Sequence, residues 1–309
     1  MPLIWALAAT ALLVPSAALA HAVTLPVTPE TLWRNWSFEL WIVIPLLAAH
    51  WLYGRGLSRL WASAGRGRGI TVAQAGCFLA GEAALVVALM SPLDALGSTL
   101  QAAHMTQHML LIAVAPPLLL LGRPEAAFGW ALGAHGGRAL ARLRSDLAWL
   151  AAPSAAAALH AAAIWAWHLP SLYHAALEND FVHWLEHIAF FGTGMLLWSV
   201  LLKGVKRPAR APAAMAAGLA TILHSGLLAA LFTFSPVLFY PWYNGRAQLW
   251  DLTPLTDQQL AGLIMWVPGM SVYLAVILLA ARTLIGGEPS APAAPSPVKK
   301  FGTTAQSVR

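Results

Sequence analysis

Two pairs of histidines stand four residues apart in the sequence. His104 and His108 form one pair, and His183 and His187 form the other. Residues four apart on a helix lie on one face, so each pair can present two imidazole rings to one point. Two imidazoles on one helix can bind one metal ion, and a second helix bearing the same pair can complete the coordination. The spacing predicts a metal site between two helices.

Methionines accompany the first pair and indicate which metal it would take. Met105 and Met109 lie on the stripe beside His104 and His108. Thioether sulfur beside imidazole favours copper, and Cu(I) in particular, because soft ligands select soft ions. The single cysteine, Cys77, lies inside an apolar run, so no Cys-x-x-Cys pair competes for the metal. Copper, with Cu(I) favoured, is the predicted ion.

Other histidines and acidic residues could ligate the metal or support its ligands. His168 joins the two pairs as a predicted ligand, and Glu186 lies inside the second pair, where it could ligate directly or orient an imidazole. Carboxylates inside a membrane are costly and are functional candidates by default. Asp94 could approach the site or cap the next helix. The further candidates for ligand or supporting positions are Met105, Met109, His160, His174, His224, Glu186, Glu82, Asp94 and His21.

The composition places these residues in a membrane. Of 309 residues, 59% are hydrophobic and only 10% are charged, whereas a soluble domain has about 25% charged residues. The net charge of +6 falls in short groups between apolar runs, which argues against nucleic acid as a partner. The lipid bilayer is therefore the predicted surroundings of the chain.

Seven apolar runs are each long enough to cross the bilayer, since about twenty helical residues span its hydrocarbon core. The predicted fold is all-α: a polytopic membrane protein with a bundle of seven transmembrane helices. The runs cover residues 37–53, 70–90, 100–121, 147–168, 181–202, 212–233 and 258–281. Pro116 and Pro117 should kink the third run. Aromatic residues near the run ends, including Tyr240 and Tyr243, suit an interfacial belt.

The basic residues give the bundle a direction. Of the eighteen lysines and arginines, only Arg34 and Arg246 fall on one side of the predicted membrane, which leaves sixteen on the other. The positive-inside rule then places the N-terminus outside and the C-terminus in the cytoplasm. In this orientation, all histidines except His50 and His135 lie outside or in the outer half of the membrane. Several helices would thus bring imidazoles to one level.

Both ends of the chain are expected to lie outside the bundle. Residues 1–20 read as a signal peptide with an Ala18-Leu19-Ala20 cleavage site. Cleavage would make His21 the N-terminus, where its amine and ring together could chelate copper. Residues 21–286 form the predicted transmembrane domain, and residues 287–309 form a disordered cytoplasmic tail rich in Pro, Ala and Ser.

Several motifs together resemble the CtaG-type assembly factors of caa(3)-type cytochrome c oxidase. They are Ser91-Pro92-Leu93-Asp94, His104-Met105-Thr106-Gln107-His108-Met109 running into Ala115-Pro116-Pro117, His168-Leu169-Pro170 with Leu172-Tyr173, His183 through His187, and Asp257-Gln258-Gln259-Leu260-Ala261-Gly262 followed by Met265-Trp266. The resemblance implies a non-enzymatic bacterial plasma-membrane protein that serves oxidase maturation and contacts cytochrome c oxidase subunits. It also implies that copper is handled by His104, His108, His168, His183 and His187. It implies no particular oligomeric state.

Three other functions stay open at this stage. The first is a metal-independent assembly scaffold that uses its histidines only structurally. The second is a b-type haem protein, because histidines on facing helices can bind haem iron axially. The third is a zinc protease, since His183-Trp184-Leu185-Glu186-His187 matches the H-x-x-E-H pattern.

Overall fold

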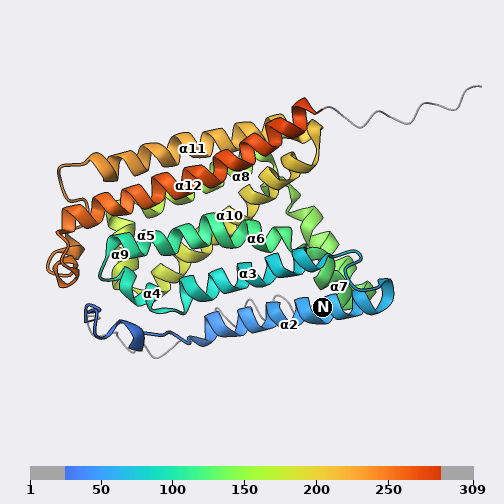
Figure 1. Cartoon of the computed structure of the whole chain (residues 1–309), viewed down its shortest axis with the longest axis horizontal. Helices are drawn as coiled ribbons and strands as arrows, with labels where there is room; N and C mark the ends of the chain where they lie inside the picture. Colours follow the sequence, from blue (N-terminus) through green and yellow to red (C-terminus); the bar gives the residue numbers. More distant parts are fainter. Residues whose placement is uncertain (1–24, 287–309) are drawn as a thin grey trace, which may run out of the picture.

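A computed structural model describes residues 25–286, and within that range the chain is helical and has no strands. The predicted signal peptide, His21 and the predicted tail lie outside the described residues. The all-helical prediction is confirmed for the part of the chain that the structure describes. The long helices lie roughly alongside one another and shorter helices connect their ends (Figure 1).

Most of the bundle is built from long helical segments. They are α2 (Leu40–Ala64), α3 (Val72–Leu89), α5 (Gln101–Met109) continuing through a π-helical turn into α6 (Ala115–Leu121), α8 (Pro153–Trp167), α10 (Asp180–Lys206), α11 (Ala211–Phe234) and α12 (Pro254–Ile285). Between them lie α4 (Pro92–Gly97), α7 (Pro124–Asp146) and α9 (Pro170–Glu178). Helices α4 and α9 lie at one end of the bundle and α7 lies at the other (Figure 1).

Six helical segments of residues 25–286 are long and apolar enough to cross a membrane. The predicted run 147–168 differs from the others, because its helix α8 has only 15 residues. At 1.5 Å per residue α8 is about 22 Å long, shorter than the roughly 30 Å of a hydrocarbon core. A short 3-10 helix, Ala148–Ala151, precedes it. The length and hydropathy of these six helices indicate a multi-pass membrane protein.

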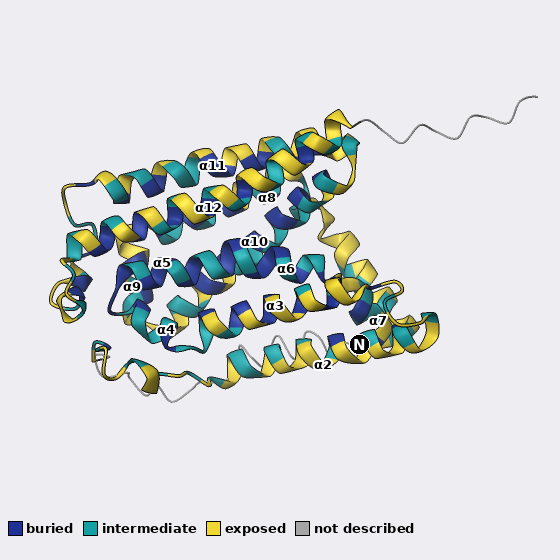
Figure 2. Ribbon diagram, in the orientation of Figure 1, coloured by how far each residue is buried: buried dark blue, intermediate teal, exposed yellow. Residues whose placement is uncertain are grey.

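The segment that carries His104 and His108 is the most enclosed of the six. In Gln101–Leu121, 61% of the apolar window is buried inside the protein, against 11% in α2. Figure 2 shows the same contrast, with buried residues along α5 and exposed ones along α2. The first histidine pair therefore sits on a central helix rather than on one that faces lipid.

The two prolines of this segment follow an interruption of the α-helix. Residues Leu110–Val114 form a single π-helical turn directly before Pro116 and Pro117. Pro116 has no N–H, so it cannot donate to the carbonyl oxygen of Ile112 four residues earlier. The Trp198 indole of α10 donates to that oxygen instead, at 2.8 Å. This bond joins the two helices that carry the histidine pairs.

Candidate metal centre

The two histidine pairs lie opposite each other, one on α5 and the other on α10. The ring centroids of His104 and His183 are 5.5 Å apart, and those of His108 and His187 are 5.8 Å apart. Within each pair the centroids are 4.2 and 4.1 Å apart. The spacing in the sequence thus places each pair on one face, and helix packing brings the two faces together.

Glu186 lies between the four rings. Its carboxylate oxygens are 3.7 Å from His104 Nε2 and 3.8 Å from His108 Nε2, and its side chain is fully buried. These distances exceed hydrogen-bond length, and neither oxygen has a hydrogen-bond partner among the described residues. Two ligands bound to one metal at about 2.0 to 2.2 Å lie roughly 3.3 to 3.8 Å apart. The spacing suits atoms that share an ion.

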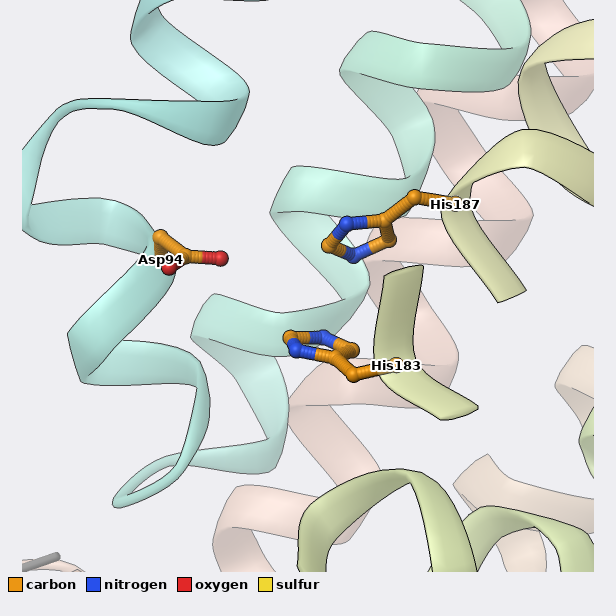
Figure 3. A group of neighbouring side chains, drawn as sticks. All are labelled: Asp94, His183 and His187. Carbon is orange, nitrogen blue, oxygen red and sulfur yellow. The ribbon is translucent and has the colours of Figure 1, made fainter. Parts of the chain in front are cut away.

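Asp94 borders the same space from α4. Its carboxylate and the rings of His183 and His187 form a group whose ligand atoms lie within 4.8 Å of one another (Figure 3). Gln107 Nε2 donates to Asp94 Oδ1 at 2.6 Å and also to the Ala88 carbonyl oxygen at 2.9 Å. Burial raises the pKa of Asp94, against the opposing effects of His183, Gln107 and His104. Asp94 therefore lies at the site while Ser91 caps α4.

His168 reaches the cluster from the end of α8. Its Nδ1 lies 2.7 Å from the Ile164 carbonyl oxygen, which can only accept, so Nδ1 carries the proton. That tautomer leaves a lone pair on Nε2, which is buried without a hydrogen-bond partner in residues 25–286. The His168 ring centroid is 6.3 Å from that of His108. Its neutral form is suited to bind a metal.

We use the name histidine cluster for the set formed by His104, His108, His168, His183, His187 and Glu186. A methionine-lined cavity of about 20 Å³ lies beside it. Met105, Met109 and Met265 contribute to its lining together with His108 and His168. Met265 of α12 joins the two methionines that the sequence had indicated. Methionine and histidine side chains thus line the same small cavity.

A carboxylate from α12 fixes the start of α5. Asp257 accepts hydrogen bonds from the backbone N–H groups of Gln101 at 2.7 Å and Ala102 at 3.0 Å. The residue that precedes α5, Leu100, has no side chain that could cap the helix. Asp257 supplies the missing cap. It therefore positions the first turn of the helix, which leads directly to His104.

Three tyrosines cover one side of the cluster. Tyr173 and Tyr240 stack with their centroids 3.8 Å apart, and the Tyr173 hydroxyl lies 2.9 Å from that of Tyr243. Tyr240 donates to the His168 carbonyl oxygen at 2.7 Å. Tyr240 and Tyr243 are buried, so their assignment to an interfacial belt is wrong. Burial raises the pKa of Tyr173 and of Tyr243 well above the usual range, which keeps both hydroxyls protonated.

Several candidates from the sequence lie apart from the histidine cluster. His160 lies 3.0 Å from the Thr193 hydroxyl, eight residues before His168 on α8 and hence about 12 Å deeper. His224 lies on α11, a helix that packs against α8, and has no hydrogen-bond partner in the described chain. Neither histidine belongs to the histidine cluster.

Two other candidates pair with residues outside the cluster. Glu82 lies 2.8 Å from His50 of α2. His174 is half exposed on α9 and lies 3.2 Å from Glu178. Neither contact brings these candidates into the histidine cluster.

Three residues that shape the site were not predicted as site residues. Asp257 and Gln107 were detectable as polar side chains at or within apolar runs, and both are fully buried. Tyr173 was indicated only as part of the Leu172-Tyr173 motif, because an aromatic residue near the end of an apolar run is ordinary. Its position depends on how α9 folds over the end of the bundle.

Fold and site together define a multi-pass helical membrane protein with a buried cluster of imidazoles around one carboxylate. Residues 51–286 match the family described as cytochrome c oxidase caa3 assembly factor, and the chain belongs to that family. The resemblance inferred from the motifs is thereby confirmed.

Two mycobacterial proteins also match. They are "Uncharacterized protein Mb0105" of Mycobacterium bovis and "Uncharacterized protein MT0111" of Mycobacterium tuberculosis, each 27% identical over 233 residues. The matched region is 70% of this chain and 35% of either relative, so the chain spans about a third of their length. No solved structure matches.

Proposed function

We propose that the protein binds copper at the histidine cluster and supplies it during the assembly of a caa3-type cytochrome c oxidase. The observation that carries this proposal is the convergence of four imidazoles on the buried Glu186 carboxylate, with a fifth, that of His168, beside His108. In the described chain, neither Glu186 oxygen has a hydrogen-bond partner, and each of the five rings has a buried nitrogen without one. Polar atoms left unpartnered in a low-dielectric interior are costly. A bound cation would satisfy them.

The donor atoms favour copper over other ions. Imidazole suits copper and zinc alike, but thioether sulfur selects Cu(I). Met105 and Met109 line the cavity that borders His108 and His168. Copper is the cargo in this proposal rather than a permanent cofactor. The family to which the chain belongs supports delivery to an oxidase, whose subunits are the proposed partners.

The proposed setting is the bacterial plasma membrane, with seven crossings and the histidine cluster on the outer side. The C-terminal ends of α2, α10 and α12, where basic residues gather, lie together at the end opposite α4 and α9 (Figure 1). The positive-inside rule assigns that end to the cytoplasm. Helix α8 with the preceding 3-10 turn would be the seventh crossing. Copper would then be taken up and released outside.

The geometry gives less support to a protease or a haem protein. In an H-x-x-E-H protease, the glutamate acts on a metal-bound water beside the substrate. Here Glu186 is fully buried and points at His104 and His108 of a second helix, as a ligand would. A haem would need a cavity of several hundred Å³, whereas the cavity beside His108 and His168 measures about 20 Å³. These observations support a non-catalytic role.

A metal-independent scaffold is the remaining alternative, and deletion of the gene separates it from copper delivery. We expect membranes of the deletion strain to lack the optical signature and the copper of assembled oxidase. Added copper should restore both if the protein delivers copper, whereas a lost scaffold would not be replaced by the metal.

Purified variants test the site itself. His104→Ala combined with His108→Ala should abolish Cu(I) binding and oxidase maturation. Copper binding and maturation at wild-type levels in this double variant would refute the proposal. His174→Ala is the control, because His174 is exposed and lies outside the cluster.

A further inference from the structure

The Glu186 carboxylate faces the first histidine pair with two different oxygen atoms. Oε2 lies 3.7 Å from His104 Nε2, and Oε1 lies 3.8 Å from His108 Nε2. A carboxylate that binds a single ion directs one oxygen, or both oxygens together, at that ion. Here the oxygens are directed at rings one helical turn apart.

The surrounding ligand atoms fall into two groups that share Glu186. One group is His104, His183 and Glu186, and the other is His108, His187 and Glu186. In each group the ligand atoms lie within 4.8 Å of one another. Each group therefore contains one histidine of α5, one histidine of α10 and the common carboxylate.

We propose that the histidine cluster binds two copper ions, with Glu186 bridging them. The first ion would lie between His104, His183 and Oε2, and the second between His108, His187 and Oε1. Metal ions held together in two-metal sites lie about 3.5 to 4 Å apart. This inference rests on the proposed copper function and adds a stoichiometry and an arrangement to it.

Two further residues extend the two groups. Asp94 shares a ligand group with His183 and His187, and His168 directs an unprotonated Nε2 into the interior beside His108. The cluster and Asp94 offer seven potential ligand residues, more than the four that one tetrahedral ion takes. A single ion would leave several buried donor atoms without a partner.

Counting ions in the purified full-length chain tests the proposal. Protein in detergent is loaded with Cu(I) without oxygen, dialysed and analysed for copper. His104→Ala with His183→Ala should remove one ion, as should His108→Ala with His187→Ala. The variant lacking all four histidines should bind two ions fewer than the wild type. A difference of one ion would overturn the two-ion site, and a difference of zero would overturn copper binding at the cluster itself.

Electron paramagnetic resonance of the wild-type protein provides a second measurement, in which the deciding spectrum needs no variant. Two Cu(II) ions sharing one carboxylate lie close enough for their unpaired electrons to couple. Wild-type protein loaded with Cu(II) should therefore give a half-field transition and less integrated intensity than its copper content. Glu186→Gln should remove the half-field transition. A wild-type spectrum of isolated Cu(II) whose intensity equals the copper content would overturn the bridged arrangement.

Discussion

The indole nitrogen of Trp198 donates a 2.8 Å hydrogen bond to the carbonyl oxygen of Ile112, the oxygen that Pro116 cannot reach. Trp198 is 1% exposed, so the bond is shielded from water and lipid. It joins α10 to the π turn that follows His108. The bond therefore fixes the position of one histidine-bearing helix along the other.

Removing this bond should weaken both the fold and the site. Trp198→Phe leaves the buried Ile112 carbonyl unpartnered, which should cost about 1 to 3 kcal/mol of unfolding free energy. Copper affinity should fall, because the two histidine pairs are no longer held in register. Thermal unfolding in detergent and Cu(I) competition titrations measure the two effects.

Trp61 provides a matched control for this substitution. Its indole donates to the Ile70 carbonyl oxygen at 2.8 Å, in a loop away from the cluster. Trp61→Phe should lower the unfolding temperature while copper affinity stays at the wild-type value. Equal losses of affinity in the Trp61 and Trp198 variants would show that general destabilisation is responsible.

The cap supplied by Asp257 should matter for the first histidine pair. The Asp257 carboxylate accepts hydrogen bonds from two backbone N–H groups. Asp257→Asn places an amide NH₂ group, which cannot accept, against one of them. We expect a loss of about 1 to 2 kcal/mol in unfolding free energy and weaker copper binding. Thr71→Ala removes the cap of α3 and should reduce stability without changing copper affinity. Unchanged copper binding by Asp257→Asn would contradict a positioning role for the cap.

The hydroxyl of Tyr240 should support His168 as a ligand. Tyr240→Phe removes the 2.7 Å hydrogen bond to the His168 carbonyl oxygen, which should loosen the backbone that carries this ligand and lower copper affinity. Tyr53→Phe removes an equally short bond, to the Gly122 carbonyl oxygen, far along the chain from the cluster. Titration of both variants with Cu(I) should show a loss for Tyr240→Phe only.

Asp94 should make the stability of the metal-free protein depend on pH. Burial raises the pKa of this carboxyl above its value in the unfolded chain. At pH values between the two pKa values, the folded state therefore holds a proton that the unfolded state has lost. The contribution of Asp94 to stability is therefore greatest below the unfolded pKa and declines as the pH rises through the folded pKa. Asp94→Asn should be relatively more stable than the wild type toward higher pH. Unfolding of both metal-free proteins across a pH series measures this difference, and parallel profiles would contradict it.

Hydropathy and spacing were sufficient to locate most helices and the faces of the histidine pairs. Apolar runs indicate where a helix can be buried, and four-residue spacing indicates which side chains share one face of a helix. The run 147–168 shows the limit of that approach. Ala152 adopts an extended conformation before Pro153, as residues before proline favour. The continuous apolar run is therefore divided between a 3-10 turn and the short helix α8.

The supporting residues depend on contacts that no local pattern encodes. Tyr240 and Tyr243 belong to the segment 235–253, which folds back against the end of the bundle and buries them. The prediction of an interfacial aromatic belt used only the distance of each aromatic residue from the end of an apolar run. It fails here because the loop packs against protein rather than against lipid headgroups. Similarly, Asp257 caps a helix that begins 156 residues earlier.

That long-range cap also bears on the order in which the protein can mature. The first-turn amides of α5 leave the ribosome well before α12, whose Asp257 carboxylate accepts their hydrogen bonds. A nascent chain that stops before α12 therefore has both histidine pairs but an α5 terminus without its cap. Competence to bind a metal would then be acquired only after α12 has been synthesised, and chains truncated before α12 would bind copper poorly.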